Sequence, residues 1–131
     1  MLTLDGVRIV QGDFTLSADL EVPRGAIVAV LGPSGAGKST LLGAVAGFVP
    51  IAAGAIRWDG ADLAGLSPGR RPLSILFQDN NLFPHLTAAQ NVGLGLRPDL
   101  RLTAAERGRV ATALARVGLA GLEDRRPAAL S

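Results

Sequence analysis

The chain has 131 residues, of which 48% are apolar, so it is long enough to bury a hydrophobic core. Its lack of cysteine excludes disulfides, thiolate metal sites and cysteine nucleophiles. A formal net charge of +2, one Trp, four Phe and no Tyr do not favour a nucleic-acid partner. We interpret the arginine doublets at 70–71 and 125–126 as solvated surface charge.

The first thirty residues have the pattern of a sheet. Apolar and polar residues alternate over 2–10 and again over 14–22, which predicts two antiparallel strands joined by a tight turn. The uninterrupted apolar run at 26–31 is typical of a strand that is buried on both faces. We therefore expect 26–31 to be a central strand of a parallel sheet.

A helix is predicted next, over 39–48, because its apolar residues recur at helical spacing. Gly47 and Pro50 are expected to end it. No charged residue lies between Lys38 and Arg57, but the glycines and the proline in this stretch argue against a membrane-spanning helix.

The rest of the chain alternates between strand and helix patterns. A short strand is predicted at 55–58, and the loop 66–72 leads to a second buried strand at 73–77. Residues 87–90 and 103–106 both fit a capping box, with Thr first and Gln or Glu fourth, so a helix is expected to begin at each. The second helix is expected to bury one face and to end at a left-handed glycine; the residues concerned are Val110, Leu114, Val117 and Gly118.

The segment between the predicted strand at 26–31 and the helix matches the phosphate-loop pattern G-x-x-x-x-G-K-[ST]. Its residues are Gly32, Pro33, Ser34, Gly35, Ala36, Gly37, Lys38, Ser39 and Thr40. The glycines let successive amides point at one centre, where phosphate oxygens also meet the positive end of the helix. We expect Lys38 to reach the β- and γ-phosphates, Ser39 to ligate Mg²⁺ and Thr40 to support the α-phosphate side. The sequence therefore predicts a nucleotide-binding site.

Further residues narrow the class of nucleotide-binding protein. The phosphate loop, followed by Leu41-Leu42, Ala46-Gly47, Gly54 and Asp59-Gly60, resembles the opening of an ATP-binding cassette (ABC) subunit of the importer type. Residues 75–87 resemble the Q-loop of that family, with Gln78 at the end of a predicted strand. The details at 79–83 and 91–96 are most similar to the ATPase subunits of bacterial thiamine importers.

This resemblance implies an α/β P-loop NTPase fold, with residues 1–131 as the N-terminal part of an ABC nucleotide-binding domain. That part would hold a parallel core sheet, an antiparallel β subdomain and, from about residue 86, the start of a helical subdomain. ATP and Mg²⁺ would be the cofactors, with Lys38 and Gln78 catalytic and with Ser39 and Gln78 near the metal. The implied partners are a membrane permease, a second ATPase subunit and, indirectly, a periplasmic solute-binding protein, at the cytoplasmic face of the cell membrane.

Two features depart from the family pattern. Where the family stacks adenine on an aromatic residue, this sequence has Val10, Gln11 and Gly12, and Phe14 is the nearest ring. Three alternatives stay open: Phe14 contacts the adenine, the base packs on apolar groups such as Val10, or the preference for adenine is weaker than usual. The last residues, 127–131, stop where the family's signature motif begins, so we expect a partial domain that lacks Walker B, the catalytic Glu and the switch His, and turns over ATP poorly.

Other interpretations of the same residues remain. Residues 73–79 superficially resemble a Walker B strand ending in Asp79, although the residues that follow favour the Q-loop. His85, the sole histidine, is expected to be structural or interfacial. A P-loop small-molecule kinase and a non-catalytic nucleotide-binding module are the alternative functions.

Overall fold

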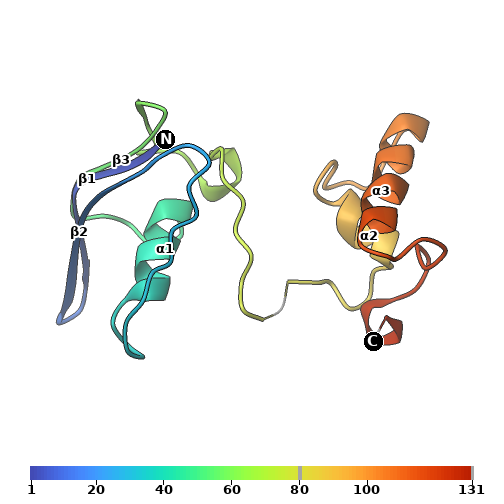
Figure 1. Cartoon of the computed structure of the whole chain (residues 1–131), viewed down its shortest axis with the longest axis horizontal. Coiled ribbons are helices and arrows are strands. Elements are labelled where there is room, and N and C mark those ends of the chain that lie inside the picture. Colours follow the sequence, from blue (N-terminus) through green and yellow to red (C-terminus); the bar gives the residue numbers. More distant parts are fainter. Residues whose placement is uncertain (80, 131) are drawn as a thin grey trace. The chain divides into compact units, whose positions relative to one another are not determined.

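The computed structural model describes residues 1–79 and 81–130. They form two compact units, Met1–Ile75 and Leu76–Ser131, which are described separately below (Figure 1). The first unit contains a sheet and one helix, and the second is helical. Asn80, in the segment that resembles a Q-loop, and Ser131 lie outside the described residues.

The first unit is built on an antiparallel sheet of four strands in the order β2-β1-β3-β4. The strands are β1 (Leu2–Gln11), β2 (Phe14–Val22), β3 (Ala53–Trp58) and β4 (Ala61–Asp62). In the centre, Leu4 of β1 lies opposite Leu20 of β2 and Ile56 of β3. The predicted hairpin of β1 and β2 and the predicted strand at 55–58 are therefore confirmed.

Helix α1 (Lys38–Ala46) lies beside this sheet (Figure 1) and confirms the helix predicted after the phosphate loop. The core under it consists of Leu4, Val7, Ile9, Ala44, Ile56 and Leu63. Ala44 is the buried contribution of α1 to that cluster, so one face of the helix is anchored to the sheet. Within residues 1–79 and 81–130, no helix is long and apolar enough to cross a membrane.

The prediction of buried strands at 26–31 and 73–77 is wrong for this structure. Both segments are without regular secondary structure, and Ile27, Leu31 and Leu76 are 99%, 89% and 84% exposed. An apolar run becomes a strand only where neighbouring strands accept and donate its backbone hydrogen bonds. No strand of the described residues pairs with either segment, so the described sheet is antiparallel and contains no parallel core.

The second unit is a helix pair, α2 (Ala88–Gly93) and α3 (Ala104–Arg116), around a small core of Ala88, Val110 and Leu114. Val117, which was expected on the same face, is 69% exposed because the helix has already ended there. Gly118 has the predicted left-handed conformation, with φ +76°. Short 3₁₀ turns at Pro68–Arg70 and Pro127–Ala129 complete the elements of the two units.

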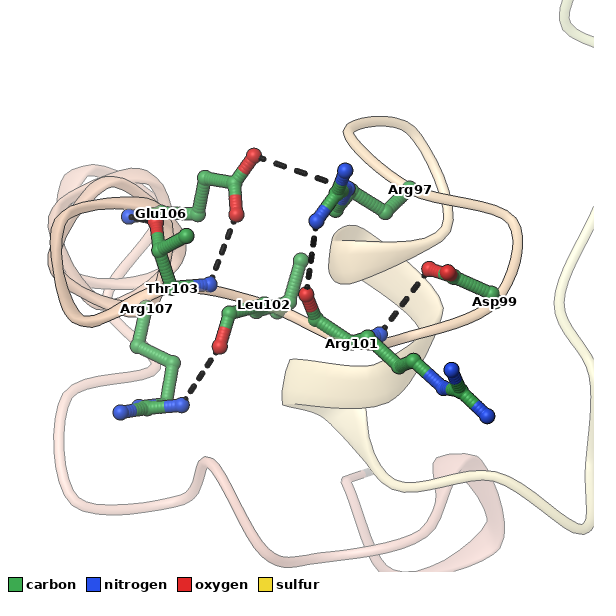
Figure 2. A network of polar contacts seen from close by, with 7 residues as sticks. All are labelled: Arg97, Asp99, Arg101, Leu102, Thr103, Glu106 and Arg107. Carbon is green, nitrogen blue, oxygen red and sulfur yellow. Dashed lines mark hydrogen bonds and ion pairs between the residues drawn. The ribbon is translucent and has the colours of Figure 1, made fainter.

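Both predicted capping boxes are present in this unit. At α2, the Thr87 hydroxyl accepts from the backbone amide of Gln90 at 3.2 Å. The side-chain oxygen of Gln90 accepts from the backbone amide of Thr87 at 2.9 Å. At α3, Thr103 and Glu106 exchange the same two bonds, at 3.2 and 2.7 Å. Figure 2 shows the bond from the Thr103 amide to the Glu106 carboxylate. The bond from the Thr103 amide, more than any other contact, holds the pKa of Glu106 below the usual glutamate range. Both helices thus satisfy their own first amides.

A candidate phosphate-binding loop

The phosphate loop joins the extended segment 26–31 to the N-terminus of α1. Gly37 stands directly before the helix with φ +89°, and Gly35 has φ +79°. Only glycine adopts this left-handed backbone without strain. The two glycines therefore give the loop the tight curl that its motif requires.

The Lys38 side chain bends back over this loop instead of extending into solvent. Its ammonium donates to the carbonyl oxygens of Gly32 at 2.8 Å and Pro33 at 2.7 Å. An ammonium has three N–H donors, so a third is available beyond these two bonds. The loop thus holds a cation beside the start of α1.

The first turn of α1 has the features of an anion-binding site. The first bond of the helix runs from the Leu41 amide to the Gly37 carbonyl at 2.8 Å, so the amides of Lys38, Ser39 and Thr40 precede the helical ladder. Within the described chain, no side chain caps this end and no acidic residue lies in the first turn. Amides at a helix N-terminus together with an ammonium group favour a phosphate.

Side chains of the β1–β2 hairpin contact the phosphate loop. A Cβ atom on Gly37 would lie 2.6 Å from Leu16 Cδ1 and 2.7 Å from Phe14 Cζ, so both side chains touch the loop backbone. The Thr40 hydroxyl donates a long hydrogen bond, 3.5 Å, to Oε1 of Gln11. The ring considered for adenine contact thus lies against Gly37. Leu16 was missed, although its place in the alternating pattern of β2 could have indicated an inward-facing side chain.

Gln78 lies in the second unit, exposed, whereas the phosphate loop belongs to the first. Close to Gln78, Asn81 closes a local turn: its Oδ1 accepts from the Phe77 amide at 2.7 Å, and its Nδ2 donates to the Phe77 carbonyl. The position of Gln78 near Mg²⁺ therefore stays a prediction.

Asn91 organises the segment after Gln78. Its Nδ2 donates to the carbonyl oxygens of Phe83, Leu86 and Thr87, and its Oδ1 accepts from the Phe83 amide at 2.8 Å. The ring of Phe83 in turn meets His85 edge-on, with centroids 6.0 Å apart. One amide side chain thus holds the backbone that leads from the Q-loop segment into α2.

The interpretation of Arg71 as solvated charge is wrong. Its side chain is partly buried, and its guanidinium donates to the carbonyl oxygens of Ala44, Val45 and Leu66 at 2.9, 2.7 and 3.3 Å. In the same doublet, Arg70 is exposed, and no hydrogen bond from its side chain is found within residues 1–79 and 81–130. The sequence contains no signal that separates the two arginines.

Comparison with known proteins identifies the family of this chain. The family model described as "ABC transporter" matches residues 16–131. The chain belongs to the ABC transporter family. The match includes the whole phosphate loop and Gln78, so the resemblance inferred from those motifs is confirmed.

Relatives in the ABC transporter family share a name. The chain is 59% identical to the thiamine import ATP-binding protein ThiQ of Cereibacter sphaeroides over 131 residues, and 47% identical to that of Escherichia coli. All of this chain is covered, but only 57% and 56% of those proteins. The chain therefore spans a little over half the length of these relatives.

A solved structure confirms the fold. The dimeric post-hydrolysis state of the ATP-binding cassette MJ0796, bound to ADP and Pi, matches with a TM-score of 0.78 and 27% identity. The match covers all of this chain and 63% of the other. The α/β P-loop NTPase fold of an ABC domain is thus confirmed, even though the described residues contain no parallel sheet.

Proposed function

We propose that this chain is part of the ATP-binding, ATP-hydrolysing subunit that drives an ABC importer for thiamine or a related small solute. The observation that carries the proposal is the phosphate loop, where Lys38 lies over its own loop beside uncapped helix amides. The names of the relatives support thiamine as the solute. None of the residues assigned here selects the solute by its own chemistry.

The proposed nucleotide site consists of Gly32, Pro33, Ser34, Gly35, Ala36, Gly37, Lys38, Ser39 and Thr40. The triphosphate of ATP would accept hydrogen bonds from the first amides of α1 and from Lys38, whose bonds to Gly32 and Pro33 can exchange for phosphate oxygens. Thr40, at the Gln11 side of the loop, would support the α-phosphate.

The Ser39 hydroxyl fits Mg²⁺ in chemistry and place, because it is an exposed oxygen ligand in the first turn of α1. Gln78 would be the second protein ligand. When bound, Mg²⁺ neutralises charge on the transferring phosphate. Phosphate oxygens of the nucleotide and water molecules would provide the other ligands, because Mg²⁺ takes six oxygens and keeps several waters. Within residues 1–79 and 81–130, no cluster of three or more His, Cys, Asp or Glu could hold a metal.

Lys38 and Gln78 are the proposed catalytic residues. Lys38 would stabilise phosphate charge, and Gln78 would orient the attacking water. None of the residues assigned here is a general base, so this chain alone would bind ATP and turn it over poorly. Residues 1–131 would form the N-terminal part of the ABC domain, with its helical subdomain from about residue 86.

The proposed assembly pairs two ATPase subunits with a membrane permease at the cytoplasmic face of the membrane. A periplasmic solute-binding protein would act on it indirectly. The segment after Gln78, which Asn91 holds in place, would face the permease. Dependence of ATP turnover on the permease would distinguish this assembly from a small-molecule kinase.

Calorimetric titration with Mg·ATP, on the chain and on Lys38→Ala, tests the nucleotide site. We expect one site per chain, with affinity reduced about 10- to 100-fold in the variant, because a hydrogen bond to a charged group contributes about 1.5–3 kcal/mol. Arg70→Met is the matched control, since it removes one exposed charge from the same unit. Equal affinity of the chain and Lys38→Ala would contradict the proposed site.

A further inference from the structure

We propose that Arg71 is a positioning residue for the phosphate loop. Its guanidinium holds the C-terminal end of α1, and through this short helix it fixes the amides at the opposite end, where the loop is. The inference rests on the proposed nucleotide-binding function.

The guanidinium joins two segments that are distant in the sequence. Nη1 donates to the carbonyl oxygens of Ala44 at 2.9 Å and Val45 at 2.7 Å, in the last turn of α1. Nε donates to the carbonyl of Leu66 at 3.3 Å, in the loop before Arg71. One planar group with several fixed donors thus ties the end of the helix to the segment that leads toward Gln78.

The backbone can satisfy only part of this helix end. The Gly43 carbonyl accepts from the amides of Phe48 and Val49, and the Ala44 carbonyl accepts from the amide of Gly47. The Val45 carbonyl accepts from Arg71. Among the described residues, no backbone amide donates to the Val45 carbonyl. A carbonyl with no backbone donor in the described chain is therefore bound by a side chain from 26 residues away.

Gly47 is shaped for this contact. Its φ of +88° closes the helix, and a Cβ atom there would lie 2.6 Å from Nε of Arg71. Any side chain at Gly47 would therefore push the guanidinium away as well as strain the backbone. Gly47, the second residue of the Ala46-Gly47 pair that resembled the ABC family, thus makes room for Arg71.

The N-terminal end of α1 depends on the bonds that Arg71 makes at the C-terminal end, because the helix is short. It has nine residues, no side-chain cap at Gly37 from the described chain and no basic residue in its last turn. Helices of this length are marginal alone, and a cation at the C-terminus favours the aligned peptide dipoles. Burial of Ala44 fixes one face of the helix, whereas the bonds from Arg71 fix its end.

The test compares Arg71→Met with its neighbour Arg70→Met by amide hydrogen exchange and NMR chemical shifts in the nucleotide-free chain, and by Mg·ATP affinity well below the unfolding temperature. We expect Arg71→Met to shift the amides of residues 35–41 and to weaken ATP binding about five- to tenfold. Arg70→Met should leave both unchanged. Arg71→Lys should lie between them, because an ammonium keeps the charge but cannot reproduce the planar fork.

Changes confined to residues 43–49, with unchanged ATP affinity, would overturn the proposal and leave Arg71 as a helix cap alone. If Arg71→Met does not fold, Arg71→Lys decides the matter, and unchanged amides at residues 35–41 in that variant would overturn the proposal. Absence of ATP binding by the unaltered chain would count against the proposed function. In that case the amide shifts would still decide the role of Arg71.

Discussion

The three α-helices of the described residues begin in two different ways. Helices α2 and α3 each start with a threonine that caps the helix and a Gln or Glu that returns the bond. Helix α1 starts at Gly37, and no described side chain occupies its first amides. Two helices therefore satisfy their own N-termini, while the third leaves its amides available for an anion and draws its support from Phe14, Leu16 and Arg71.

The largest loss of stability and of ATP binding is expected at Gly37, where no other residue fits the backbone and the space before α1. Gly37→Ala should destabilise the first unit by about 2–4 kcal/mol, because it adds left-handed strain to a clash with Phe14 and Leu16. It should also abolish measurable Mg·ATP binding, since the amides after Gly37 would turn away from their common centre. Denaturant unfolding and calorimetry measure the two effects.

Gly35→Ala separates strain from packing. Gly35 has φ +79°, close to that of Gly37, but a Cβ atom there would meet nothing within 4 Å. Its stability loss should therefore be about 1–2 kcal/mol, the contribution of the backbone alone. An equal loss in the two variants would mean that the hairpin side chains do not support the loop.

The local chemistry of this chain and its β1–β2 hairpin were predictable from the sequence, but contacts between segments distant in the sequence were not. The capping threonines and the glycines after α1 and α3 work through residues at most five positions away, so the pattern contains all the participants. Segment 26–31 has an equally clear apolar pattern but needs neighbouring strands that the described residues do not provide. The prediction for Arg71 was wrong for a related reason, because two of its three acceptors lie on a helix 26 and 27 residues away.

A smaller effect is expected at a helix that caps itself. Thr103→Ala removes the hydroxyl that accepts from the Glu106 amide and should destabilise α3 by about 1 kcal/mol. Mg·ATP binding should not change, since α3 (Ala104–Arg116) contains none of the residues proposed for the nucleotide site. Amide exchange of residues 104–110 would measure the loss.

Thr112→Ala is the control on the same helix. The Thr112 hydroxyl donates to the Gly108 carbonyl one turn earlier, at 2.9 Å, on an exposed surface. Alanine has the higher helix propensity, so this change should be neutral or slightly stabilising. If both threonine variants lost stability equally, the capping role of Thr103 would be refuted.

The smallest expected effect is a pH dependence of stability at α3 but not at α2, because only the α3 capping box contains a charged residue. The Thr103 amide, first among several contacts, lowers the pKa of Glu106 in the folded chain, so the carboxylate stabilises α3 at pH values above the unfolded pKa of about 4.3. That contribution should be lost as the pH falls from there through the lower folded-state pKa. Gln90 fills the same role at α2 without a charge, so amide exchange at α2 should not follow this titration. Glu106→Gln should give α3 the same indifference to acid, and a pH dependence that persisted in this variant would place the titrating group elsewhere.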